Sequence, residues 1–465
     1  MARKQSVVTR EKRLGAIGAY LGDISSLTEN FDSAEPSQRI RTFSQTAPDD
    51  SIAALRLLNG ITGVGIIVHG ARGCAAAQLA LAADGAWAVT NLNERDTIMG
   101  SDAILRKSIL ALYGRHQPWV IFVVATPAVA INNDDIQSVV IELSEELGIP
   151  VVRVRSDGFR SRIAATGADA AIQAILPLVP LSSASRNNDL INLIVTDGES
   201  SAAPELAALL EGIGLAVNIL PFSAGKEQFE KAAQAAVTVV VDPDAGALFA
   251  QGIEAAHRVP YLKLPVPVGL AATGAWLAAI GAETGRSETA ELLHRAQLEA
   301  VTAFSPTTEF DGVRVYLGFP VAIATAVASL VNDSGGTVVG VSVDSVDAGN
   351  VHELKKMQES QAGVPLHVAA GQPFEEANIL RRIAPDLYVG TLDQAVSAAR
   401  AGIPAVAIHP EELLGYTGLS CLLRRVHKAR ANKAFAQRLS RDTPPPYKEA
   451  WYRRSPDWHI KREVK

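Results

Sequence analysis

The segment 119–154, WVIFVVATPAVAINNDDIQSVVIELSEELGIPVVRV, contains the pattern that decides the fold. It begins with an uninterrupted apolar run, Trp119–Ala125, and ends with a second β-branched run at 150–154. Between them, residues 134–147 have apolar positions at the spacing of one helix face. Strands that are apolar without alternation are buried on both faces, which is typical of parallel sheets, and parallel strands need a helical crossover. The segment therefore predicts a right-handed βαβ unit.

The same strand–helix–strand pattern recurs along the chain. It is found at 191–196, 204–210 and 215–220; at 237–241, 246–257 and 261–264; at 313–317, 320–331 and 337–343; and at 387–390, 394–401 and 405–408. We expect an α/β fold of three Rossmann-like, doubly wound parallel-sheet domains, at 46–188, 189–311 and 312–410, with linkers at 181–188 and 305–312. Ligand sites in such folds lie at the carboxyl ends of the strands.

The two ends of the chain have a different composition. Residues 1–45 are polar, with Pro36 as a breaker, and are expected to form an extension that wraps a partner or the body. Residues 411–465 are expected to form a C-terminal helix, from Tyr416 to about Leu439, followed by an extended tail with three consecutive prolines.

Composition excludes several classes of function. The chain has 465 residues, with 43 Lys and Arg against 49 Asp and Glu, so no broad basic surface favours nucleic acid. No apolar run approaches the ~20 residues of a membrane helix, and the basic residues 1–13 are not followed by the apolar stretch of a secretory signal. Two cysteines exclude a disulfide framework and favour a reducing compartment. We therefore expect a cytoplasmic protein with no nucleic-acid or membrane partner.

The common nucleotide and hydrolase motifs are absent from the sequence. There is no GxGxxG after a strand, no GxxxxGK[ST], no GxSxG, no CxxC and no HExxH. The stretch IIVHGARGCA at 66–75 stands out instead: a predicted strand ends at His69, and Cys74 opens an Ala-rich helix. A thiol at a helix N-terminus favours its thiolate form, and Gly70 and Gly73 would let the backbone approach a bulky inorganic group. The alternative is a small buried cysteine in a tight turn.

Several motifs in the same order resemble the nitrogenase component 1 family. HGARGC at 69–74 resembles that family's H-G-x-x-G-C turn, and NLNERDTIMGSDAILRKSI at 91–109 is similar to its stretch ending E-x-D-x-[VI]-x-G-G-x-x-x-L. Asn133–Asp135 stand where the family has G-D-D opening a helix, and His409 with GYTG at 415–418 resembles the L-G-Y-x-G turn of beta-type subunits. The resemblance extends over residues 46–440, most of the chain.

The resemblance implies an iron–sulfur cluster, [4Fe–4S] or P-cluster-like, at the interface of an alpha-type and a beta-type chain. Cys74 matches one beta-type cluster ligand, within the turn of Gly70 and Gly73. The family's upstream cysteine would fall near Ser51 and its third near Thr126 or Pro127, and neither is a cysteine here. One cysteine cannot hold a cluster, so the remaining ligands would come from the partner or from oxygen donors. Ser51 is a candidate oxygen ligand, and the alternative is a helix N-cap serine.

The other chemistry-bearing residues carry weaker expectations. Cys421 is expected to be a buried small residue, and His409 a hydrogen-bonded structural histidine. Glu94 and Asp96 are expected in a turn or an interface, with a proton relay as the alternative.

The resemblance implies a beta-type subunit of a nitrogenase-like two-component reductase in an (αβ)2 assembly. Its cluster would relay electrons from a homodimeric, ATP-dependent iron protein to a metal cofactor in the alpha-type subunit. The alternatives are a scaffold for cofactor assembly, a tetrapyrrole reductase subunit, and a metal-free Rossmann-like binding module. Among substrates, carbon–sulfur bonds of methylthio compounds are favoured, because HGARGC and LGYTG look closer to true nitrogenase chains than to tetrapyrrole enzymes.

Overall fold

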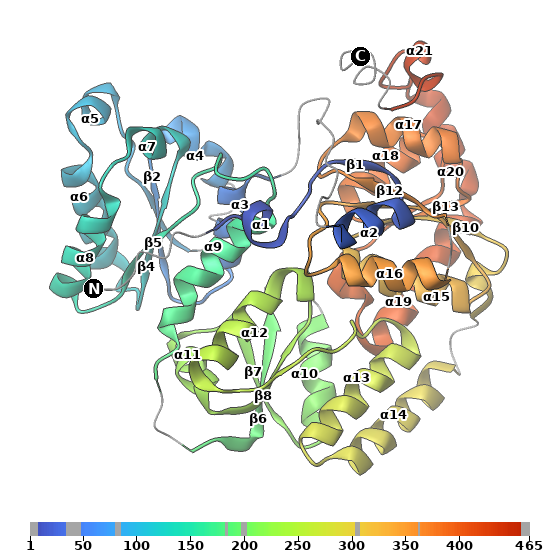
Figure 1. The fold of residues 1–465 in the computed structure, drawn as a ribbon, viewed down its shortest axis with the longest axis horizontal. Helices are drawn as coiled ribbons and strands as arrows, with labels where there is room; N and C mark the ends of the chain where they lie inside the picture. Colours follow the sequence, from blue (N-terminus) through green and yellow to red (C-terminus); the bar gives the residue numbers. More distant parts are fainter. Residues whose placement is uncertain are drawn as a thin grey trace. The chain divides into compact units, whose positions relative to one another are not determined.

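The computed structural model describes residues 8–33, 48–79, 85–181, 185–196, 202–302, 307–360 and 363–456. These residues form three β-sheets with flanking helices (Figure 1). They divide into two compact units, the first drawn from 1–13, 48–198 and 215–263 and the second from 14–47, 199–214 and 264–465. The predicted α/β fold with doubly wound parallel sheets is confirmed. The domain boundaries stay a prediction, and the two expected linkers lie partly outside the described residues.

The first unit contains the βαβ segment predicted at 119–154. Its first sheet has the order β3-β2-β4-β5, from Ala86–Val89, Gly65–His69, Ile121–Ala125 and Val151–Val154, and all three pairings are parallel. Strands β2 and β4 are buried along their whole length, as their apolar runs predict. The main helices around this sheet are α3 (Asp50–Asn59), α6 (Asp102–His116), α8 (Ile136–Leu147) and α9 (Ala165–Ile175). Because β2 pairs with β4 up to His69 and Ala125, the turns that follow the two strands meet at one edge.

The second sheet of this unit is also parallel. Its order is β7-β6-β8-β9, from Ala216–Pro221, Asn187–Val195, Ala235–Val240 and Tyr261–Leu262. Strand β6 therefore begins inside the segment expected to be a linker. Helices α11 (Lys226–Lys231) and α12 (Pro243–His257) accompany it. One apolar core runs from Ala54 in α3 to Val259 beyond α12 and joins the two sheets of the unit.

The second unit is built on a six-stranded sheet of order β1-β12-β11-β10-β13-β14. The parallel strands are β10 (Arg314–Gly318), β11 (Thr337–Val343), β12 (Pro365–Val368), β13 (Leu387–Gly390) and β14 (Ala405–Ala407). Figure 1 shows α15 (Val321–Asp333) and α16 (Val351–Ser360) on one face, and α17 (Pro373–Ile383) and α18 (Leu392–Arg400) on the other. Helices α10 (Ala202–Gly212), α13 (Gly269–Glu283) and α14 (Ser287–Thr302) complete this unit.

Residues 14–33 of the N-terminal segment, expected to wrap a partner or the body of the chain, pack on the second unit. Strand β1 (Tyr20–Asp23) lies antiparallel to β12 at the edge of the six-stranded sheet, and α2 (Ile24–Asp32) follows it. Ile17, Ile24 and Leu27 are buried. Residues 34–45 lie outside the described residues, so the expectation for them stays a prediction.

The C-terminal segment differs from the expected single helix and extended tail. Two helices, α19 (Gly415–Ala431) and α20 (Lys433–Asp442), replace the single helix, and Asn432 separates them. The tail after Asp442 contains a short helix, α21 (Glu449–Tyr452), that packs against α17. Among the described residues, no helix combines the length and apolar character needed to cross a membrane.

Candidate functional site

Cys74 lies in the first turn of a helix at the carboxyl edge of the first sheet. Strand β2 ends at His69, and α4 (Arg72–Leu79) begins three residues later. Both Cys74 and Gly73 are exposed, and a Cβ atom on Gly73 would meet no heavy atom within 4 Å. The interpretation of Cys74 as a buried cysteine is therefore wrong. Its thiol is accessible to a group from outside the chain, and open space surrounds the neighbouring glycine.

Gly70 has a different role from Gly73. A Cβ atom on Gly70 would lie 2.0 Å from Oγ1 of Thr126, the residue that follows β4. The Thr126 amide donates a hydrogen bond to the His69 carbonyl at 2.9 Å, which fixes the two strand ends together. Gly70 is thus required for close packing inside the chain, whereas Gly73 leaves space at the surface.

His69 is fully buried beneath the turn and is held through both ring nitrogens. Nδ1 lies 3.0 Å from Thr90 Oγ1, and Nε2 lies 3.0 Å from Ser101 Oγ. The Ser101 hydroxyl donates to Asp134, so Ser101 accepts from Nε2–H and Thr90 faces the unprotonated Nδ1. Burial lowers the pKa of His69 to about 4, against the opposing effect of Asp134. The imidazole is therefore neutral near pH 7 and orients the turn.

The segment before α3 forms the next part of this edge. The Ser51 hydroxyl donates to Asp49 Oδ1 at 2.8 Å, and the same oxygen accepts from the Ile52 amide at 2.8 Å. The N-cap of α3 is therefore Asp49, and the interpretation of Ser51 as an N-cap is wrong. A Cβ atom on Gly158 would lie 3.3 Å from Pro127 Cγ and 3.5 Å from Ser51 Oγ.

Ser51 and Pro127 thus lie close together around Gly158. They stand near two of the positions, Ser51 and Thr126 or Pro127, at which the resemblance would place cysteines. Cys74 stands at the remaining one of these positions, on helix α4, which contacts α3. Within the described ranges, no three His, Cys, Asp or Glu side chains are grouped so as to hold a metal ion. The chemistry that this edge offers a metal group is one exposed thiol.

Asp50 is a buried acid at this edge that sequence reasoning missed. It accepts a hydrogen bond from Ser156 Oγ at 2.8 Å, and its Oδ1 has no hydrogen-bond partner within the described part of the chain. Burial is the main cause that raises the pKa of Asp50 to about 6. The partners Thr90, Ser101 and Ser156 were missed as well, because each lies after a different strand or at a helix start. The motif at 91–109 was the available signal for Ser101.

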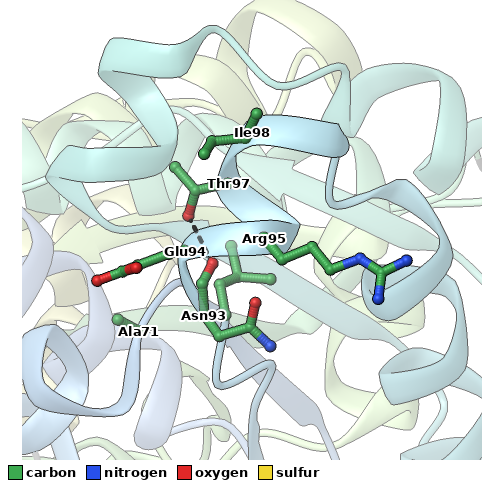
Figure 2. A pocket seen from close by; sticks show the side chains of 7 residues that line it. Ala71, Asn93, Glu94, Arg95, Thr97 and Ile98 are labelled. Atoms are coloured by element: carbon green, nitrogen blue, oxygen red, sulfur yellow. Dashed lines mark hydrogen bonds between the residues drawn. The ribbon is translucent and has the colours of Figure 1, made fainter.

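An open hollow of about 870 Å3 adjoins the Cys74 turn at Ala71. Its other wall is α5 (Glu94–Met99), and Figure 2 shows Glu94 and Arg95 leaving this helix in opposite directions. Asp96 lies in a capping box: its amide donates to Asn93 Oδ1, and its carboxylate accepts from the Asn93 amide, both at 3.0 Å. Asp96 is therefore a helix residue whose carboxylate caps the start of α5, rather than the expected turn residue, and Glu94 lines the hollow.

Large apolar side chains are exposed on α5 and on the helix that follows β4, and one of them, Ile98, lines the hollow. Ile98 and Met99 of α5 are 81% and 75% exposed, and Ile131 of α7 (Pro127–Asn132) is 73% exposed. The Asn132 side chain donates to the Thr97 carbonyl at 3.3 Å and joins the two helices. We name Ile98, Met99 and Ile131 the α5–α7 patch. These three side chains leave apolar surface exposed on two helices that the Asn132 hydrogen bond joins.

The two weaker candidates lie in the second unit. His409 precedes the short helix η4 (Pro410–Leu413), and its amide donates to Glu412 Oε1 at 3.2 Å. Because this contact is made by the backbone, the expectation of a hydrogen-bonded histidine side chain stays a prediction. Cys421 on α19 is partly rather than fully buried, which differs from the expected buried cysteine.

Comparison with known proteins places these observations in a family. The model of the family described as nitrogenase component 1 type oxidoreductase matches residues 50–430. The chain belongs to this family. The match includes the Cys74 turn, α5, α7 and the surroundings of Gly158. The resemblance read from HGARGC and the later motifs is confirmed.

Members of this family with different names are similar to the chain. The nitrogenase iron–molybdenum cofactor biosynthesis protein NifE of Nostoc sp. is 25% identical over 357 residues, which are 73% of this chain and 72% of that protein. A subunit of the light-independent protochlorophyllide reductase of Cereibacter sphaeroides is 24% identical over 77% of this chain and 69% of that protein. The solved structure "Nitrogenase Cp1 at pH 5" matches 92% of this chain and 96% of its own, at a TM-score of 0.72 and 18% identity, and shares the fold.

Proposed function

We propose that this family member is a beta-type subunit of a nitrogenase-like two-component reductase and ligates an interface iron–sulfur cluster through Cys74. The observation that carries the proposal is the exposed thiol in the first turn of α4, with open space at Gly73. Iron–sulfur clusters are held by cysteine thiolates, and backbone N–H groups at a helix N-terminus stabilise negative charge. When bound, the cluster supplies one-electron relay.

Cys74 is the single ligand that we propose from this chain. Ser51 is buried, and its hydroxyl is committed to Asp49, so ligation by Ser51 would require that hydrogen bond to break. Gly70 and Thr126 fill the space between the strand ends and leave no room for an external group there. The remaining ligands would therefore come from the partner subunit.

We propose that the α5–α7 patch adjoins the alpha-type subunit. Ile98 of this patch lines the hollow that also includes Ala71, three residues before the proposed cluster ligand. Burial of Ile98, Met99 and Ile131 against a partner would stabilise the assembly. The assembly proposed is (αβ)2, and the electron donor proposed is a homodimeric, ATP-dependent iron protein. A large obligate interface is expected, and an isolated chain that stays monomeric beside its partner would contradict the proposal.

The substrate proposed is the carbon–sulfur bond of a methylthio compound. The relatives named for protochlorophyllide reduction make a tetrapyrrole the competing substrate. An anaerobic assay of the complex with the iron protein, ATP and each substrate separates the two.

A second candidate function is a scaffold for cofactor assembly. It is favoured by the relatives named as iron–molybdenum cofactor biosynthesis proteins, which match up to 80% of this chain. The test is to purify the chain with its genomic neighbour and the iron protein. ATP-dependent substrate reduction supports the reductase, and transfer of a metal cofactor to a recipient protein supports the scaffold.

The role of Cys74 is tested in the same purified complex. Cys74→Ala is expected to fold and assemble while losing cluster iron, because the side chain is exposed and contributes little to the core. Cys74→Ser is expected to retain a weaker cluster through its hydroxyl. Cys421→Ala is the matched control and is expected to keep the full iron content. A Cys74→Ala complex with unchanged iron and an unchanged cluster spectrum would overturn the ligand assignment.

A further inference from the structure

A cavity of about 500 Å3 lies in the second unit, between α17, α18, α20 and the C-terminal segment 443–456. Its volume falls within the roughly 300–1,000 Å3 typical of small-molecule sites. The apolar part of its wall includes Ala377, Ala401, Pro445 and Pro446, and Tyr447 and Tyr452 add two aromatic rings. Neither the Cys74 turn nor the α5–α7 patch contributes to it.

The C-terminal wall of this cavity is fixed to α17 by several contacts. The Trp451 ring stacks on Phe374 with centroids 3.8 Å apart, and its Nε1–H donates to the Phe374 carbonyl at 3.3 Å. The fully buried Asn378 donates to the carbonyls of Trp451 and Arg454 at 2.9 and 3.0 Å. The tail is therefore held in place before any ligand arrives, which lowers the entropic cost of binding.

Two arginines line the cavity, and they differ in what neutralises them. Arg381 forms an ion pair with Glu449 at 2.9 Å, and its guanidinium lies 4.5 Å from the centre of the Tyr452 ring. Arg400 forms no ion pair or hydrogen bond with any residue that the structure describes. Burial raises the pKa of Tyr447 above its ordinary value, and the positive charge of Arg400 partly counteracts that rise.

The cavity thus combines an uncompensated guanidinium with a phenol that stays protonated and an apolar wall. A guanidinium binds carboxylate and phosphate groups through paired N–H donors, and a neutral phenol adds another donor. The prolines and the tyrosine rings suit a flat apolar body.

We propose that this cavity binds a small organic anion, with its carboxylate or phosphate on Arg400 and its aromatic body between Tyr447 and the prolines. This site goes beyond the proposed function, since it requires neither the cluster nor Cys74.

The test is isothermal titration of the full-length chain with phenyl phosphate and with benzoate, using benzyl alcohol as the uncharged probe. Saturable binding of at least one anion is expected, and the tighter of the two identifies the head group. Arg400→Gln is expected to weaken that binding about tenfold or more. Ala401→Leu, which fills the cavity and keeps the charge, is expected to weaken it as well.

The matched control is Arg382→Gln, an exposed arginine of α17 that does not line the cavity. It is expected to bind the anion as the unchanged chain does. The proposal is overturned if neither anion binds saturably, if Arg400→Gln binds as tightly as the unchanged chain, or if benzyl alcohol binds as tightly as the anions. Thermal unfolding of each variant verifies that the exposed substitutions leave the fold intact.

Discussion

Gly70 and Thr126 approach so closely that a Cβ atom at position 70 would lie 2.7 Å from the Cβ atom of Thr126 as well as 2.0 Å from its hydroxyl oxygen. The hydroxyl is buried and has no hydrogen-bond partner among the described residues. The turn after β2 therefore packs directly against the turn after β4, and this packing requires a glycine at position 70.

Gly70→Ala is expected to destabilise the chain by about 1–3 kcal/mol, the usual cost of overpacking. Urea unfolding measures this difference. The clash involves the Thr126 Cβ, which Thr126→Gly removes. The double variant Gly70→Ala/Thr126→Gly is therefore expected to lose less stability than the summed losses of the two single variants. Equal stability of Gly70→Ala and the unchanged chain would contradict this account of the packing.

Gly73→Ala is expected to leave the fold intact and to stabilise α4 by up to about 1 kcal/mol, because alanine favours helix over glycine. The added methyl group points into open space in the chain alone. In the purified complex, the same variant is expected to lower the iron content, because the proposed cluster would occupy that space. Full iron content in a stable Gly73→Ala complex would place the cluster away from this glycine.

His69 predicts a pH dependence of stability in acid. The pKa of His69 is about 4 in the folded chain and about 6.5 in the unfolded chain. Between these pH values the unfolded chain binds more protons than the folded chain. The free energy of unfolding therefore falls as the pH drops from 6.5 to 4. The total loss is on the order of 3 kcal/mol. Urea midpoints between pH 4 and 7 measure this slope. His69→Gln is expected to flatten it, and His116→Gln, at an exposed position, is expected to leave it unchanged.

Glu376 predicts the opposite dependence. Burial raises its pKa to about 8, so the folded chain binds more protons than the unfolded chain between about pH 4.3 and 8. Stability is then lost as pH rises across that window. Glu376→Gln is expected to be more stable than the unchanged chain at pH 8 by roughly 4–5 kcal/mol, and nearly equal to it at pH 4.5. The exposed Glu359→Gln serves as the control, and identical pH profiles for all three would contradict the prediction.

Loss of the Asp169 carboxylate is expected to destabilise the fold strongly, because this carboxylate binds two arginines of the N-terminal segment. Its buried carboxylate accepts from Arg10 at 2.8 and 2.9 Å and from Arg13 at 2.7 Å. Asp169→Ala removes the carboxylate that pairs with the buried Arg10 and is expected to cost roughly 3–5 kcal/mol in chemical unfolding. Glu142→Ala, which removes an exposed partner of Arg106, is expected to cost less than about 1 kcal/mol.

The parallel strands were predictable because local pattern and tertiary role agree there. The run at 119–125 and the helix at 134–147 appear as β4 at 121–125 and α8 at 136–147. Burial on both faces forces continuous apolar strands, so the signal lies in the sequence itself. The partial burial of Cys421 could have been predicted in the same way, because Cys421 lies beside the buried stripe of α19, which is formed by Leu419, Leu422, Leu423 and Val426.

The site and the chain ends were less predictable because they depend on contacts between distant residues. The sequence motif located Cys74 and Gly70, but the partner of Gly70, Thr126, is known only from the register of β2 and β4. The three consecutive prolines indicated an extended tail, yet stacking of Trp451 on Phe374 holds a helical turn there. Such long-range contacts leave no periodic signal in the chain.

The pairing of β1 with β12 has a consequence for biosynthesis. Tyr20 lies opposite Val368, about 350 positions later in the chain. At translation rates of about 5–20 residues per second, the first strand leaves the ribosome roughly 20–70 seconds before its neighbour exists. During that interval the edge-forming segment is open to nascent-chain chaperones or to strands of other chains. The edge strand next to β12 is therefore among the first segments to be synthesised and can join the six-stranded sheet only after β12 has been made.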